Sequence, residues 1–203
     1  RQWGACWLGL AVWEWVDFDR FWRPRLRRNR EGTDWLNVFK TLVCYRLIDP
    51  GSEWRVHRQW FARSAMGDLL GEDGALAQPS RLYRCLDMLV EHKQSMFSFL
   101  RERWQTLFKA GFEVLLYDLT STYFESDPPE QESLRKFGYS RDKRSDCVQV
   151  VIALIVTPEG LPLAYEVMAG NTSDKSTLWG FVEKIEAQYG KAIRGKEEPR
   201  KEI

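Results

Sequence analysis

The chain has 203 residues, of which 44% are hydrophobic and 29% charged, and its formal net charge is +1. This balance is typical of a globular protein with enough apolar material for one sizeable domain, or for a helical domain joined to part of another. Because positive and negative charges nearly cancel, the composition excludes a general basic field, and any contact with DNA must come from local patches.

The chain has four cysteines that lie far apart: Cys6, Cys44, Cys85 and Cys147. They form no CxxC pair and no Cys/His cluster, so we expect neither a zinc site nor a disulfide framework, and a reducing, cytoplasmic location. The apolar stretch 3–16 contains Glu14, is too short for a membrane span, and lacks the basic start and cleavage site of a signal peptide. We therefore expect no membrane partner.

Residues 1–110 carry the spacing of helices rather than strands. After residue 30 we expect three main helices, and the first two have a polar residue able to cap their start, Thr33 or Asp34 and Ser52. The third helix is expected to begin at Ser80, just after Pro79. The third pattern continues without a break until Gly111 ends it.

The pattern changes after Gly111 to short apolar runs. Residues 114–117 predict a buried strand, and the polar segment 121–146 predicts a long exposed loop. Residues 147–156 and 161–168 predict a hairpin across the turn sequence TPEG, with a helix after it. The predicted order in this half of the chain is strand, long loop, hairpin, helix.

Asp118 directly follows the predicted strand 114–117. A carboxylate at the end of a buried strand is costly to desolvate unless it is paired or bound to a metal. A central strand also holds a metal ligand with little positional freedom. In the alternative interpretation, Asp118 caps the strand or accepts hydrogen bonds from Thr120 and Thr122. The strand pattern alone does not decide between these two.

Three motifs follow one another along this half: YDLTSTYFE at 117–125, GYSRDKRSD at 138–146, and VIALIVTPEGLPLAYEVMAGNTSDKSTL at 151–178. Together they resemble insertion-sequence transposases with an RNase H-like catalytic core, in the group with D-x-T, G-x-S-x-D-x-R and G-N-x-x-D motifs. The helical segments DWLNVFKTLVCYRLIDPGSEWRVHRQW and SRLYRCLDMLVEHK are also similar to this family. The resemblance covers nearly all of residues 1–192.

The resemblance implies a mixed α+β or α/β chain. Residues 1–110 would form a helical DNA-binding region, and 111–190 the N-terminal part of an RNase H-like catalytic domain. Members of the family cut DNA at the ends of their element and join the 3′ ends to a target. They use two Mg²⁺ ions held by an Asp-Asp-Glu triad, since two cations about 4 Å apart stabilise both the attacking and the leaving oxygen. Asp118 matches the first carboxylate of that triad and is the predicted Mg²⁺ ligand.

The rest of the triad is expected on a later strand and helix, which the sequence after Ala192 does not supply. We therefore expect a C-terminally truncated chain, a disordered, aberrant tail at 191–203, and no transposition by this chain alone. Asp174 does not fill the gap, because NTSD at a helix start is typical of capping. Asp142 and Asp146 stand among arginines and lysines, which favours solvated ion pairs.

Three basic regions are candidates for phosphate contact, and each can equally be a solvated charged segment. The first has six arginines within eleven residues: Arg20, Arg23, Arg25, Arg27, Arg28 and Arg30. From it we select Arg25, Arg27 and Arg28 as DNA-binding. The second region comprises Arg55, His57, Arg58 and Arg63. In the third, the predicted loop, Lys143 and Arg144 are the chosen DNA contacts.

Other residues near these regions have structural interpretations. Trp54 and Trp60 are expected in the core rather than stacked on bases. His57 and His92 lack metal-ligand spacing, so we expect both at the surface or at its boundary.

The sequence leaves more than one function open. The first is a transposase whose partners are the terminal repeats of its element and the target DNA, with a possible homodimer. The second is a non-catalytic DNA-binding or dimerising regulator of transposition, which needs no later Asp or Glu. An unrelated RNase H-like nuclease does not predict the helical front half.

Overall fold

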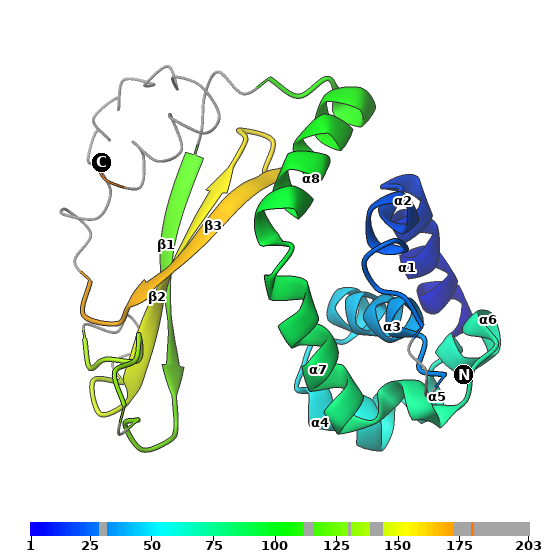
Figure 1. Ribbon diagram of the computed structural model, residues 1–203, viewed down its shortest axis with the longest axis horizontal. Coiled ribbons are helices and arrows are strands. Elements are labelled where there is room, and N and C mark those ends of the chain that lie inside the picture. The colour runs from blue at the N-terminus through cyan, green and yellow to red at the C-terminus, as the bar shows by residue number, and fades with distance from the viewer. Residues whose placement is uncertain (29–31, 112–115, 130, 139–143, 173–179, 181–203) are drawn as a thin grey trace, which may run out of the picture. The chain divides into compact units, whose positions relative to one another are not determined.

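The computed structural model describes residues 1–28, 32–111, 116–129, 131–138, 144–172 and 180, with only the backbone described at 116–118. The chain divides into two compact units, 1–96 and 97–203 (Figure 1). The boundary falls inside helix α8 (Lys93–Phe108), so the later part of this helix belongs to the second unit.

The first unit is built from short helices. These are α1 (Trp3–Trp15), α2 (Phe18–Trp22), α3 (Trp35–Ile48), α4 (Glu53–Arg55), α5 (Phe61–Arg63), α6 (Met66–Leu70) and α7 (Pro79–Val90). A π-helical turn, η1 (Val56–Trp60), joins α4 to α5, and a 3₁₀ turn, η2 (Gly74–Ala77), precedes α7.

Two helices begin where the sequence predicts. Asp34 caps α3 by accepting a hydrogen bond from the backbone N–H of Asn37 at 3.0 Å. Ser52 caps α4 in the same way, accepting from the N–H of Arg55 at 3.3 Å. Each cap satisfies a backbone donor that the helix itself leaves without a partner, and both predictions are confirmed.

The core of the first unit is aromatic. Trp13 and Trp22 both pack edge to face on Phe39, with ring centroids 5.2 and 5.0 Å apart. Helix α1 comes close to α3 at Gly9, where an added Cβ would stand 2.9 Å from Sγ of Cys44. Burial raises the pKa of the Cys44 thiol to about 12, so this sulfur stays protonated at neutral pH.

The predicted long third helix is wrong, because it is two helices. α7 ends at Val90 and α8 begins at Lys93. Between them the N–H of His92 donates to the carbonyl of Leu89 at 3.0 Å, a tight turn in place of a helical bond. The ring of His92 lies 5.9 Å from that of buried Trp22. The break between α7 and α8 therefore lies where His92 packs near Trp22, and no glycine or proline marks it in the sequence.

The second unit is an antiparallel sheet beside a helix. Its strands are β1 (Leu116–Phe124), β2 (Val148–Val156) and β3 (Pro162–Ala169), in the order β1-β2-β3. Phe97 of α8 packs on Tyr165, with ring centroids 5.8 Å apart, and Nε1 of Trp104 donates to the carbonyl of Pro162 at 3.0 Å. Helices and a small antiparallel sheet together make this an α+β chain.

The predicted hairpin of β2 and β3 is confirmed. Its turn closes with a hydrogen bond from the N–H of Gly160 to the carbonyl of Thr157 at 2.9 Å. Gly160 has a φ of 86°, which a residue without a side chain adopts at little cost. A second bond, from the N–H of Thr157 to the carbonyl of Leu161, completes the connection.

The first strand is longer than predicted. It continues to Phe124, so the assignment of residues 121–124 to a loop is wrong. Ser121, Thr122 and Tyr123 pair with Val151, Val150 and Gln149 of β2. Threonine and tyrosine are common in strands, and here they pair with a largely apolar neighbouring strand. The polar character of residues 121–124 was therefore not a reliable sign of a loop. The predicted strand residues 114 and 115 and the predicted helix after the hairpin lie outside the described residues.

In the parts of the chain that the structure describes, no helix is both long and apolar enough to cross a bilayer.

Candidate functional site

Asp118 lies inside β1 rather than at the end of a strand. It is the third of nine strand residues, and its backbone pairs with that of Leu154 on β2. The residues that alternate with it along the strand, Thr120 and Thr122, are exposed, and so is Leu154. This face of the sheet is therefore accessible at Thr120, Thr122 and Leu154, whereas the burial of Asp118 itself lies outside what the structure describes.

The structure describes the backbone of Asp118 and not its side chain, so the surroundings of its carboxylate lie outside the described atoms. No set of three or more His, Cys, Asp or Glu side chains able to hold a metal ion occurs among the residues that the structure describes. A carboxylate suits Mg²⁺, which prefers oxygen ligands, but one carboxylate provides only a fraction of a two-metal site. Asp174 and Asp142 lie outside the described residues.

The segment before the second motif is anchored to the sheet by its backbone. Lys136 and Gln149 exchange two hydrogen bonds, of 3.0 and 2.9 Å, as neighbouring antiparallel residues do. The N–H of Gly170 donates to the carbonyl of Leu134 at 2.9 Å. Part of the predicted exposed loop is therefore attached to the end of the hairpin.

Two motif glycines meet at this anchor. A Cβ on Gly138 would collide with the carbonyl oxygen of Gly170, and a Cβ on Gly170 would collide with the carbonyl oxygens of Gln149 and Lys136. The buried side chain of Gln149 completes the junction, its Nε2 donating to the Gly170 carbonyl at 2.9 Å. Gln149 is not among the residues predicted for the site. Gly138 and Gly170, which open G-x-S-x-D-x-R and G-N-x-x-D, were a usable signal of close backbone approach but not of Gln149 itself.

The charge of Arg144 is offset by two acidic side chains at the surface. Its guanidinium donates to Asp146 at 3.0 and 3.1 Å and to Glu125 at 2.8 Å, and lies 5.0 Å from the ring centroid of Tyr123. The hydrogen bond from Arg144 lowers the pKa of the Asp146 carboxyl. The predicted pairing of Asp146 is confirmed, and this one cation faces two anions. Lys143 lies outside the described residues.

The three selected arginines of the first basic region have different partners. Arg28 forms ion pairs with Glu72 at 2.8 Å and Asp34 at 3.4 Å. Arg25 donates to the carbonyl of Phe21 at 2.6 Å and stacks over that ring at 3.8 Å. Exposed Arg27 donates to the backbone carbonyl of Pro24 at 3.1 Å. Among the residues that the structure describes, Arg28 is the one of the three whose charge is offset by carboxylates.

Asp19 neutralises other cations of the same region. Its carboxylate accepts from Nε1 of Trp13 at 2.6 Å and from Nζ of Lys40 at 2.9 Å, and it also pairs with Arg23. Partial burial acts to raise the pKa of this carboxyl, but the hydrogen bonds from Lys40, Trp13 and Arg23 outweigh it, so the pKa lies below its ordinary value. Arg20 pairs with Asp17 at 3.3 Å, and Arg30 lies outside the described residues.

The second basic region combines cations with an exposed ring. Trp60 is buried as expected, but Trp54 is 56% exposed, so its assignment to the core was wrong. Arg58 lies 4.9 Å from the Trp54 ring centroid, and Nδ1 of His57 lies 3.1 Å from the carbonyl of Ala77. His57 and His92 are both half-buried, as expected.

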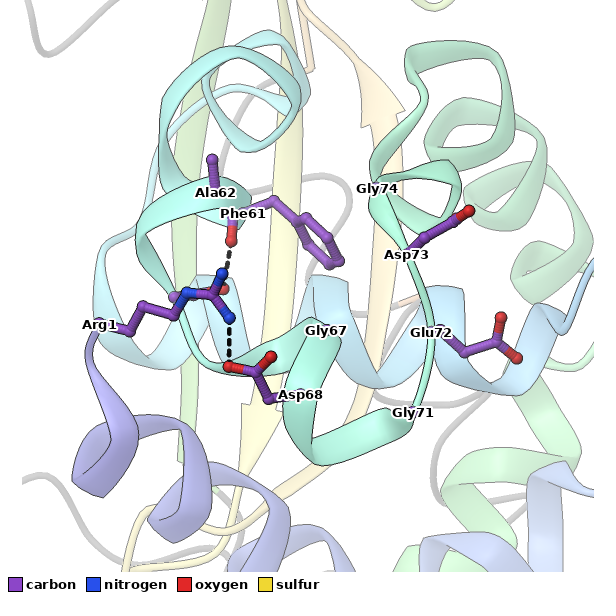
Figure 2. A pocket seen from close by; sticks show the side chains of 10 residues that line it. Arg1, Phe61, Ala62, Gly67, Asp68, Gly71, Glu72, Asp73 and Gly74 are labelled. Carbon is purple, nitrogen blue, oxygen red and sulfur yellow. Dashed lines mark hydrogen bonds and ion pairs between the residues drawn. The ribbon is translucent and has the colours of Figure 1, made fainter.

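A hollow of about 650 Å³ in the first unit has no counterpart in the predictions (Figure 2). Arg1 reaches into it and pairs with Asp68, beside the ring of Phe61. Glu72 and Asp73 also line it, so the carboxylates outnumber the cation. The excess of negative charge does not suit a phosphate. The side chains that line the hollow also do not pair a nucleophile with a general base.

Comparisons of the chain with protein-family models, with curated proteins and with solved structures found no match to any of them.

Proposed function

We propose that this chain is part of an insertion-sequence DDE transposase, in which the helical first unit binds DNA and Asp118 is the first catalytic carboxylate of an RNase H-like core. The motifs carry the family resemblance, and the arrangement of the sheet supports it. The D-x-T aspartate lies in the first strand, and the two later strands form a hairpin whose first strand pairs antiparallel with it, in the order that the resemblance implies.

The observation that carries the proposal is the meeting of two motifs. Gly138 opens G-x-S-x-D-x-R and Gly170 opens G-N-x-x-D, and the two glycines are in backbone contact although they are far apart in sequence. Both motifs therefore serve one junction at the edge of the hairpin. The contact gives the first glycines of two motifs a structural role. This supports the view that the three motifs occur together because of the fold and not by chance.

In this proposal Asp118 contributes one oxygen ligand to Mg²⁺. The ions would polarise the scissile phosphate and activate the attacking oxygen, and the protein's part is to fix their position and balance their charge. The two remaining acids of the triad are not among the residues that the structure brings near β1, and no aspartate follows Asp174 in the sequence. The assay for cleavage therefore uses the longest protein that the locus encodes.

Replacing the metal ligand tests the catalytic assignment. In that protein, Asp118→Asn is expected to abolish Mg²⁺-dependent cleavage at the element ends, because the amide removes the ligand charge and keeps the shape. DNA binding should be unchanged, since phosphate contacts lie on other residues. Cleavage that survives the substitution would refute the role of Asp118, whereas loss of binding as well would indicate a folding defect.

A non-catalytic regulator is the second candidate. It is favoured by exposed Arg25 and Arg27, for which the described part of the chain shows backbone carbonyl acceptors and no paired carboxylate. The two candidates differ at Asp118: a regulator that occupies element ends should repress transposition equally well with aspartate or asparagine there.

A further inference from the structure

Trp54 of α4 presents an aromatic ring at the surface with a cation beside it. The residue is 56% exposed, although Glu53 and Val56 close by in the chain are buried. The guanidinium of Arg58 lies 4.9 Å from the centroid of the Trp54 ring. The ring of His57 lies 5.8 Å from it, tilted by 51°. Trp54, His57 and Arg58 therefore form one surface patch on α4 and η1, which we call the Trp54 patch.

The patch stands on a buried support. Val56 and Trp60 of η1 are buried, and the ring of Trp60 packs on that of Tyr45, with centroids 5.1 Å apart. Nδ1 of His57 lies 3.1 Å from the carbonyl of Ala77, which is within hydrogen-bond distance. A π-helical turn such as η1 is rare and is found frequently at functional sites. Because the patch is held in place before any ligand arrives, little side-chain entropy would be lost on binding.

The acids near the patch are already paired with other arginines. Asp49 accepts from Arg55 at 2.8 Å, and Glu53 pairs with Arg46. In the part of the chain that the structure describes, Arg58 contacts the Trp54 ring and has no carboxylate partner. A contact with a ring leaves the charge of a guanidinium in place. The patch is therefore positively charged.

The neighbouring helix does not cancel this charge. α7 packs against α4 (Figure 1) and carries Arg81 and Arg84 against one acid, Asp87. Arg81 donates to the carbonyl of Ala75 at 3.0 Å, and Arg84 lies 5.5 Å from the ring centroid of Trp35. Neither arginine pairs with a carboxylate among the described residues. The surroundings of the patch therefore favour a negatively charged ligand.

A ligand that suits the patch combines a flat ring with negative charge. Each nucleotide of a nucleic acid carries both, as a base and a phosphate. Stacking on an aromatic side chain needs a base whose face is free, and arginine contacts to phosphate add to the affinity. In a fully paired duplex the base faces are covered by one another. The chemistry of the patch therefore favours a single strand over a duplex.

We infer that the Trp54 patch binds single-stranded DNA, with an unpaired base stacked on Trp54 and a phosphate of the same strand on Arg58. This inference rests on the proposed DNA-binding role of the first unit, and it specifies the form of DNA and the residues that contact it. The contact does not involve Asp118.

Fluorescence anisotropy of the full chain with a labelled oligothymidine strand, and with a duplex of equal length, tests this inference. Trp54→Ala should weaken single-strand binding at least about five-fold, as loss of one stacked base does, and should leave duplex binding unchanged. Trp54→Phe keeps a ring and should lose much less. Trp7→Ala is the matched control, because Trp7 is 63% exposed in the same unit and no cation lies over its ring among the described residues. It should leave both affinities unchanged.

Arg58→Ala tests the phosphate contact. It should weaken single-strand binding and flatten its salt dependence by about 0.7, the value for one phosphate of a single strand. Since Trp54, Arg58 and Trp7 are all exposed, circular dichroism should show native helix content for every variant.

The outcomes separate this inference from the proposed function. Duplex binding by the wild type, with single-strand binding that Trp54→Ala and Trp7→Ala affect equally, would overturn the inference and leave the proposed function standing. A wild-type chain that binds neither DNA would overturn both the inference and DNA binding by the first unit. A change in sedimentation of the chain by Trp54→Ala, with unchanged DNA affinity, would assign the ring to a protein contact and overturn the inference as well.

Discussion

In the first unit the contacts that fix the chain run between side chains, whereas beside the hairpin of the second unit they run between backbone atoms. Trp13, Lys40 and Arg23 converge on the carboxylate of Asp19. Gly138 and Gly170 instead let two segments approach until carbonyl groups fill the space that a Cβ would need. A substitution in the side-chain cluster removes one contact and leaves the others in place. At the backbone junction, a substitution that adds even one methyl group collides with a carbonyl group. The two units should therefore respond very differently to small substitutions.

The backbone junction should show the largest effect. Gly170→Ala places a methyl group against the carbonyl oxygens of Gln149 and Lys136, which cannot move without breaking the hydrogen bonds between them. The expected loss in free energy of unfolding is about 3 kcal/mol. Urea denaturation measures it. Gly111→Ala is the control, because a Cβ there meets nothing within 4 Å. Similar losses for both variants would contradict the proposed junction.

The side-chain cluster should show an intermediate effect that depends on pH. Asp19→Asn leaves Lys40, whose side chain is only 14% exposed, without its anion, and should cost about 2 kcal/mol at pH 7. The folded-state pKa of Asp19 lies below the unfolded value of 3.8, so its stabilisation is present above that value and is lost as the pH falls through the lower folded pKa. The difference between variant and wild type should shrink correspondingly in acid. A difference that is constant from neutral pH to pH 3 would exclude this origin.

The smallest effects are expected for DNA binding. Arginines with similar sequence contexts should differ here, because only some of them are paired with carboxylates in the structure. Replacing Arg25, Arg27 and Arg28 together by alanine should weaken binding and flatten its salt dependence by about 0.9 for each phosphate that is no longer neutralised. Arg27→Ala should contribute more than Arg28→Ala, because Arg28 already pairs with Glu72 and Asp34. Arg144→Ala should change affinity least, because Glu125 and Asp146 offset its charge. Fluorescence anisotropy at several salt concentrations measures all four variants, and an unchanged slope for the triple variant would refute this surface.

Much of the local structure could be predicted from the sequence. Caps at Asp34 and Ser52 and the turn before Gly160 follow from side-chain chemistry over a few residues, so local rules suffice for them. The break between α7 and α8 could not be predicted, since it accompanies the packing of His92 near Trp22, which is distant in sequence. The exposure of Trp54 is likewise a property of the assembled unit.

Less of the candidate site could be predicted from the sequence. A run of arginines predicts local positive charge, but the acids that offset it at Arg28 and Arg144 are identified by the fold. Asp118 is proposed as a site residue from its motif alone, whereas its position near the start of β1 is known from the strand pairing with β2. The role of Gln149 has no sequence signature, because glutamine at a strand start is usually solvated.

The four cysteines of this chain are all buried and unpaired. Burial also raises the pKa of the Cys85 thiol to about 12, as it does for Cys44, and the thiolate is the form that reacts with alkylating reagents. Cys44 and Cys85 should therefore be nearly unreactive toward a maleimide at neutral pH, and burial limits access of the reagent to Cys6 and Cys147. A single cysteine introduced at an exposed position such as Arg27 would then carry a dye or spin label without prior removal of the natural thiols, which gives each surface discussed above its own spectroscopic reporter.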